Sequence, residues 1–155
     1  MNREIERRFL VPVVPDLHSY ESKRILQGYI TSGGDNEVRV RQIGATYFIT
    51  VKSGAGIERD EVEVELHPEQ FELLWELTAG RRLEKTRFYL PIAPRIVELD
   101  VYDLDLSSLI IAEVEFPTLH SSRNFLPPSW FGRDVSDDLS YKNSRLALYG
   151  LPPET

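Results

Sequence analysis

Near its amino terminus the chain reads Glu4-Ile5-Glu6-Arg7-Arg8, with charged residues at alternate positions. Successive side chains of a β-strand point to opposite faces, so Glu4, Glu6 and Arg8 would share one face of a strand. The same spacing recurs in Arg39-Val40-Arg41, Thr50-Val51-Lys52, Arg59 to Glu65, Lys85-Thr86-Arg87, Glu98-Leu99-Asp100 and Glu113-Val114-Glu115. Between the charged positions the residues are largely apolar. The pattern predicts many strands that each carry one charged face, with both signs of charge represented.

Length and composition describe an ordinary globular chain. Its 155 residues predict a single domain over 1–155, and 41% hydrophobic with 28% charged residues is typical of soluble proteins. The absence of cysteine excludes disulfides and thiolate metal sites and favours the cytoplasm. We expect no membrane partner, since neither a signal-peptide pattern nor a long apolar stretch is present. A net charge of −7 disfavours nucleic acid, so a bound anion would need a local basic pocket.

Alternation and turn residues predict about eight strands with helices between and after them. The expected strands are 3–11, 25–31, 37–42, 46–52, 60–66, 82–90, 96–102 and 109–116. A turn at 32–36 and a glycine-containing loop at 53–57 should connect neighbouring strands. The expected helices are 16–24, 68–78 and about 139–149, and the stretch from 117 to 128 is expected to be irregular.

Two arrangements of the charged faces fit this periodicity. A one-sided sheet would point its apolar face at the core and its charged face at water. A closed barrel of about eight strands would instead enclose room for side chains or one small ligand, and the charged faces would line it. The apolar outer faces would then need cover from residues 71–75 and 146–149, or from a second subunit in a homodimer. Periodicity alone leaves both arrangements open.

In their order and spacing, these segments resemble the CYTH domain superfamily, the triphosphate tunnel metalloenzymes, and above all its small bacterial inorganic tripolyphosphatases. The resemblance covers nearly the whole chain. It rests on the Glu-x-Glu-x-Lys signature at Glu4 to Arg8, on the charged segments named above, and on Gln27-Gly28-Tyr29 and Tyr141-Lys142-Asn143. It implies a mainly β (α+β) fold, a closed antiparallel eight-stranded barrel with covering helices, whose charged faces line a tunnel. The chain departs from the signature at Arg8, which replaces Lys but keeps the charge and can bind phosphate in a bidentate manner.

The resemblance also implies an activity: metal-dependent hydrolysis of inorganic tripolyphosphate to pyrophosphate and phosphate. The expected cofactor is Mg²⁺ or Mn²⁺, with two ions present when substrate is bound, because carboxylates and substrate phosphates suit these cations. The implied metal ligands are Glu4, Glu6 and Glu115, with Glu63, Asp100 and Glu113 in supporting or second-site roles. The implied substrate clamp is Arg8, Arg39, Arg41, Lys52, Arg59, Lys85 and Arg87. Arg8 and Lys85 are also expected to act in catalysis, and either Glu61 or Glu63 would place the attacking water.

Other functions remain alternatives. Hydrolysis of a nucleoside or thiamine triphosphate would call for an exposed aromatic side chain near the tunnel mouth, for which Tyr29 and Trp130 are candidates. Adenylyl cyclase relatives carry a His-Phe pair ahead of the signature, and no such pair precedes Glu4 here. A non-catalytic polyphosphate-binding module would need the cations but not the ring of glutamates.

Overall fold

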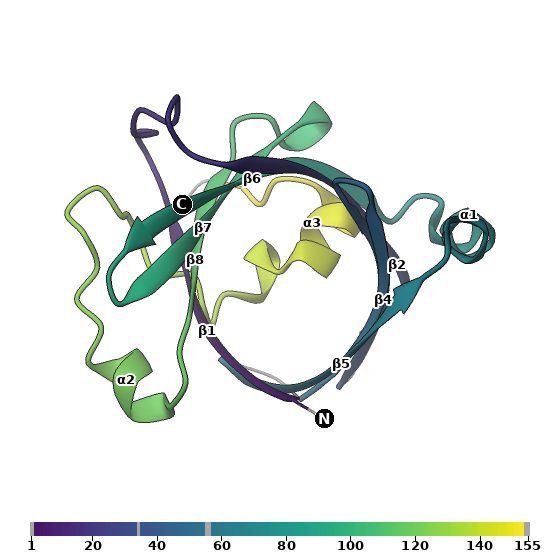
Figure 1. Cartoon of the computed structure of the whole chain (residues 1–155), viewed down its shortest axis with the longest axis horizontal. Helices are drawn as coiled ribbons and strands as arrows, with labels where there is room; N and C mark the ends of the chain where they lie inside the picture. Colours follow the sequence, from purple (N-terminus) through teal and green to yellow (C-terminus); the bar gives the residue numbers. More distant parts are fainter. Residues whose placement is uncertain (1, 34, 55–56, 154–155) are drawn as a thin grey trace.

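The strands of this protein close into one antiparallel barrel, in the order β1-β5-β4-β3-β2-β6-β7-β8 (Figure 1). The computed structural model describes residues 2–33, 35–54 and 57–153. The strands are β1 (Asn2–Leu10), β2 (Ser22–Gly33), β3 (Asn36–Ile43), β4 (Thr46–Ser53), β5 (Glu58–Leu66), β6 (Arg82–Ile92), β7 (Arg95–Tyr102) and β8 (Ile110–Glu115). The predicted eight-stranded closed barrel is therefore confirmed. The expected turn at 32–36 and loop at 53–57 include residues 34 and 55–56, which lie outside the described residues.

The charged faces of the strands point into the barrel. In the register, Glu6 pairs with Glu115 and Arg8 with Glu113, so the charged positions of β1 and β8 lie opposite one another. Arg8, Arg39 and other cations that point inward are buried. Arginine side chains are rarely buried unless they are paired with an acceptor. Because the barrel has no free edge, each strand is paired on both sides and the charged interior is enclosed.

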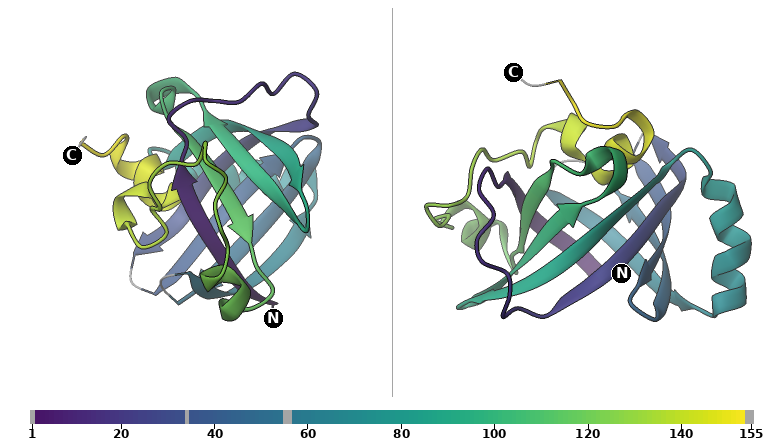
Figure 2. Two further views of the ribbon diagram at one scale, coloured as in Figure 1. Left: turned by 90° about the vertical axis from the view of Figure 1, so that its left-hand side faces the viewer. Right: turned by 90° about the horizontal axis from the view of Figure 1, so that it is seen from above.

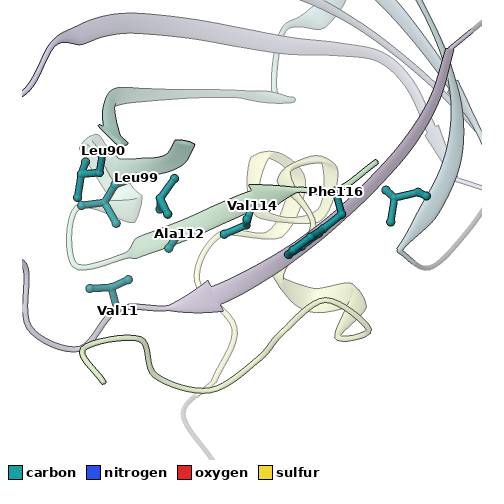
Figure 3. Close-up of a cluster of buried hydrophobic side chains, with 8 residues drawn as sticks. Val11, Leu90, Leu99, Ala112, Val114 and Phe116 are labelled. Carbon is teal, nitrogen blue, oxygen red and sulfur yellow. The ribbon is translucent and has the colours of Figure 1, made fainter. Parts of the chain in front are cut away.

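The apolar outer face of β1, β6, β7 and β8 forms the main hydrophobic core. Val97, Leu99 and Val114 are at most 1% exposed and pack with neighbours that Figure 3 shows on this side of the barrel. The cover comes from the segment after β8, where Phe125 and Phe131 pack against Phe9 with ring centroids 6.1 and 4.9 Å away. Burial of this surface supplies the hydrophobic stabilisation that the charged interior cannot.

The opposite side of the barrel has less cover. The helix α1 (Pro68–Trp75) continues as a 3₁₀ turn at Glu76–Thr78 and lies outside β2 to β4 (Figures 1 and 2). Its contact with β2 is close, since a Cβ on Gly28 would lie 2.5 Å from Thr78 Oγ1 and 2.9 Å from Trp75. Only glycine permits that approach. Further round the barrel, Val62 and Val64 stay 45% and 53% exposed, so this outer surface lacks the cover that the sequence led us to expect.

One end of the barrel is closed by the C-terminal helix α3 (Asn143–Tyr149), which lies across the opening in Figure 1 and beyond the strands in Figure 2. The predicted helix at 139–149 is divided, because Lys142 adopts an extended conformation between α3 and a 3₁₀ turn at Leu139–Tyr141. Leu146 is buried in a second apolar cluster, but Leu148 and Tyr149 are 42% and 67% exposed. The helix therefore caps the barrel end rather than covering its side.

Two further expectations were wrong. Residues 16–24 form no helix: Asp16 accepts a hydrogen bond from the His18 amide in a local turn, and β2 begins at Ser22. Pairing of Ser22 to Gly28 with β6 outweighs the weak local helix signal. Conversely, the stretch expected to be irregular contains a short helix, α2 (Leu119–Arg123), whose first turn is capped by Thr118. Among the described residues, no helix has the length and apolarity needed to cross a membrane.

Candidate active site

The barrel interior holds a polar cavity of about 220 Å³. Nearly all of the predicted site residues line it: Glu4, Glu6, Arg8, Arg39, Arg41, Lys52, Arg59, Glu61, Glu63, Arg87, Glu113 and Glu115. Lys85 and Asp100 do not line it, and both are fully buried. With Glu98 of β7, the fold brings together charged residues from seven strands at one place, which is what alternation along each strand requires once the sheet is closed.

Three carboxylates gather at one side of the cavity. Glu4, Glu6 and Glu115 each offer an oxygen atom within 4.8 Å of the others. Glu115 keeps contact with solvent, but partial desolvation in the cavity, followed by repulsion from Glu98, Glu4 and Glu6, raises its pKa to about 7. Burial and the charge of Glu113 also raise the pKa of Glu6. Such an excess of negative charge fits a divalent cation with oxygen ligands, so these three residues are a suitable metal site.

Arg39 and Arg41 of β3 give another part of the cavity wall an excess of positive charge. The Nε atoms of Arg39 and Arg41 are buried and have no hydrogen-bond partner among the described residues. Burial, together with repulsion from Arg39 and Arg87, lowers the pKa of Arg41 to about 10. Its nearest carboxylate, Glu63, is 3.4 Å away and is held more closely by Thr50 at 2.7 Å. A buried guanidinium with unused donors indicates a place for an anion.

The remaining carboxylates are held by cations of the protein itself. Glu113 accepts from Arg8 Nε at 3.0 Å and from Arg87 Nη2 at 2.7 Å, and although burial opposes them, these cations hold its pKa well below the usual value. Lys52 links the two charged regions, with its Nζ 2.8 Å from Glu4 and 3.8 Å from Glu61. Glu113 is therefore engaged on both oxygens, whereas in the cluster of Glu4, Glu6 and Glu115 the described residues supply one ion pair, that of Glu4 with Lys52.

Several lining residues were not among the predicted site residues: Tyr29, Glu37, Ile43, Tyr89, Glu98, Ser136, Lys142 and Asn143. Glu37, Tyr89 and Glu98 lie two positions from Arg39, Arg87 and Asp100, so strand parity could have found them. Ser136 sits in an irregular segment and gave no signal. Of the two aromatic candidates, Tyr29 lines the cavity but is 1% exposed. Trp130 does not line it and packs on Phe131 outside the barrel, with ring centroids 4.6 Å apart.

Residues 2–140 match the CYTH domain. The chain belongs to the CYTH domain family. Two curated members carry the name inorganic triphosphatase. One, from Nitrosomonas europaea, is 47% identical over 150 residues, which is 94% of this chain and 97% of the relative. The other, from Acetivibrio thermocellus, is 35% identical over 150 residues, or 94% of each chain.

Solved structures share this architecture. The crystal structure of an inorganic triphosphatase matches with a TM-score of 0.71 at 42% identity, covering 98% of this chain and 99% of the other. A protein from Pyrococcus horikoshii matches with a TM-score of 0.59 at 19% identity, covering 77% and 82% of the two chains, and supports the fold alone. The predicted membership of the CYTH superfamily and its barrel fold are confirmed.

Proposed function

We propose that this CYTH protein hydrolyses inorganic tripolyphosphate to pyrophosphate and phosphate in a metal-dependent reaction. One observation carries the proposal: a single cavity separates a cluster of carboxylates from a wall of buried arginines with unused donors. A linear anion with bound cations matches both regions at once. The name inorganic triphosphatase of relatives at 47% and 35% identity supports the same activity.

Glu4, Glu6 and Glu115 would hold the first ion, and Glu63 and Glu113, which line the same cavity, would support it or a second ion. Asp100 does not line the cavity and would act only through Arg87. Mg²⁺ or Mn²⁺ suits such oxygen ligands, and we propose that two ions are present with substrate. When bound, the metal neutralises phosphate charge and increases the acidity of coordinated water. For Glu113 we favour the supporting role, because it is paired with arginine.

The protein residues would orient and neutralise the substrate. Arg39, Arg41, Lys52, Arg59 and Arg87 would clamp the phosphates, with Arg8 completing the basic set and acting in catalysis. Lys85, which does not line the cavity, would contribute by holding Asp100 against Arg87. A water oxygen would bond to the terminal phosphorus as the bridging P–O bond breaks, and pyrophosphate would leave with the bond's electron pair. Glu61 or Glu63 would position the water and receive its proton, and both line the cavity. Cations near the leaving oxygens would stabilise the charge that develops there.

The remaining features of the proposal concern the whole molecule. We propose that residues 1–155 act as one domain, in the cytoplasm, on a small anionic substrate. A homodimer that covers exposed Val62 and Val64 remains a hypothesis.

The test is phosphate release from tripolyphosphate, ATP, thiamine triphosphate and pyrophosphate in parallel, each with Mg²⁺ and with Mn²⁺. The proposal predicts metal-dependent turnover of tripolyphosphate well above the other three substrates. Preferential turnover of an organic triphosphate would replace the proposed substrate. Tight binding of tripolyphosphate without turnover would identify a binding module instead.

A further inference from the structure

Residue 8 is attached to the C-terminal part of the chain by its backbone. The Arg8 amide donates to Ser136 Oγ at 3.0 Å, and the Arg8 carbonyl accepts from the Val135 amide at 2.8 Å. Here β1 is no longer paired with β5, whose register with β1 ends at Ile5, and the C-terminal segment occupies that side of the strand. The wall of the cavity at Arg8 is therefore shared between the barrel and the segment that leads to its closed end.

The side chain of Arg8 also connects the barrel with the C-terminal segment. Its Nε donates to Glu113 on β8 at 3.0 Å, and its Nη2 donates to the Tyr102 hydroxyl on β7 at 3.3 Å. Its Nη1 donates to the main-chain carbonyl of Tyr141, in the turn before α3. Of the five N–H groups of a guanidinium, three are thus used by acceptors on three different elements.

The connection continues into the end plug, by which we mean residues 139–149. The Tyr102 hydroxyl, which accepts from Arg8, donates in turn to Asn143 Oδ1 at the start of α3. Apolar packing of Leu146 against Leu83 and Ile111 holds the far part of the helix. Within the plug, Lys142 and Asn143 line the cavity. The polar contacts therefore fix the part of the plug that faces the proposed substrate.

We infer that Arg8 is a positioning residue, whose guanidinium fastens the end plug to the barrel wall and so fixes Lys142 and Asn143 at the closed end of the cavity. A planar guanidinium donates in fixed, diverging directions, whereas a lysine ammonium donates from one point. The three donors of a lysine ammonium share one nitrogen, so lysine at position 8 could not span Glu113, Tyr102 and Tyr141, which three different guanidinium nitrogens contact. The departure from the Glu-x-Glu-x-Lys signature thus gains a structural role, in addition to any contact of Arg8 with phosphate.

Hydrogen exchange of the full chain, without metal or substrate, tests the fastening directly. The reporters are the Leu146 and Gly150 amides, which donate to the Lys142 and Leu146 carbonyls within the plug. In Arg8→Lys their exchange should accelerate about tenfold, the scale of a lost charge-assisted hydrogen bond, while amides of β3 and β4 keep their rates.

The adjacent variant Arg7→Lys is the matched control. Arg7 lies on the opposite face of β1 and binds Asp134 and the carbonyls of Ser122 and Phe125. Its substitution should accelerate exchange in residues 119–134 and leave the plug unchanged. Equal plug protection in Arg8→Lys and the wild type would overturn the inference.

A second variant covers the case in which Arg8→Lys does not fold. If Arg8→Lys exchanges everywhere and is therefore unfolded, Tyr102→Phe decides, since it removes only the bond to Asn143 and an acceptor of Arg8. Faster plug exchange in that variant supports the inference, and unchanged exchange contradicts it.

If the proposed function holds, placing Lys142 should also affect substrate binding. The affinity for tripolyphosphate in a double-mutant cycle with Lys142→Met tests this effect. If Arg8 acts by placing Lys142, Arg8→Lys should weaken binding in the wild type but not in the Lys142→Met background. Equal losses in both backgrounds would mean that Arg8 acts on phosphate independently of Lys142. A wild type that does not bind tripolyphosphate would refute the proposed function, and the exchange result would still decide the fastening.

Discussion

Lys85 donates a 2.6 Å hydrogen bond to Asp100, and neither side chain is exposed to solvent or to the cavity. Asp100 also accepts from Arg87 Nε at 2.7 Å and from Nη2 at 2.9 Å, and Arg87 does line the cavity. Burial lowers the pKa of Lys85 to about 8, although Asp100 opposes this shift. The pair is therefore buried beside the cavity and orients Arg87, which lines it.

Removing the charge of Asp100 should destabilise the fold. In Asp100→Asn the buried Lys85 loses its hydrogen-bonded counterion, and such a loss costs about 3–5 kcal/mol in the free energy of unfolding. Urea denaturation measures this change. The control is Glu65→Gln, an exposed side chain near the end of β5, which should shift the free energy by less than about 0.5 kcal/mol. Similar stabilities of the two variants would show that the pair is not needed for the barrel.

The acidic cluster should make the stability of the metal-free protein depend on pH. The pKa of Glu115 is about 7 in the folded protein, against an ordinary value of 4.5. A raised pKa means that the folded state binds a proton more tightly than the unfolded state. The contribution of this proton to the free energy of unfolding is therefore complete below pH 4.5 and is lost as pH rises through about 7.

The melting temperature without metal should therefore fall between pH 5 and 7.5, and added Mg²⁺ should oppose the fall because it replaces the protons. Glu115→Gln should flatten the metal-free profile. An unchanged slope in that variant would assign the effect to other groups.

Arg41 is expected to favour binding at the expense of stability. Its charged form is disfavoured by burial and by Arg39 and Arg87, which lower its pKa to about 10. Arg41→Met should therefore keep or raise the melting temperature while weakening tripolyphosphate binding about tenfold or more, the scale of a lost charge-assisted hydrogen bond. Titration calorimetry and thermal melting measure the two effects.

The control for Arg41→Met is Arg24→Met. Arg24 pairs with Glu84 at 2.5 Å and with Asp103 outside the cavity, so its loss should leave the affinity unchanged. Unaltered binding by Arg41→Met would remove Arg41 from the substrate clamp.

Sequence periodicity predicted the strands well because a closed barrel repeats one rule, with charge inside and apolar residues outside. It could not decide between inside and outside, since that depends on closure, a property of the whole sheet rather than of any strand. It also missed Ser136, which lies in an irregular segment. A hydrogen bond from the Arg8 amide holds its hydroxyl at the cavity. Lys85 and Asp100 have the parity of site residues, yet they do not line the cavity, because parity gives the face of a strand and not the depth along the barrel.

The metal-dependent hydrolysis is tested by Glu4→Gln, which removes one carboxylate charge from the cluster of Glu4, Glu6 and Glu115 and leaves the arginine wall intact. Phosphate release from tripolyphosphate and its equilibrium binding are measured together, with and without Mg²⁺. If these carboxylates hold the metal, wild-type turnover requires it, and Glu4→Gln loses about 100-fold or more of the turnover while binding tripolyphosphate as tightly as before or more so. Turnover by Glu4→Gln at the wild-type rate and with the same metal dependence would contradict that role of the carboxylates.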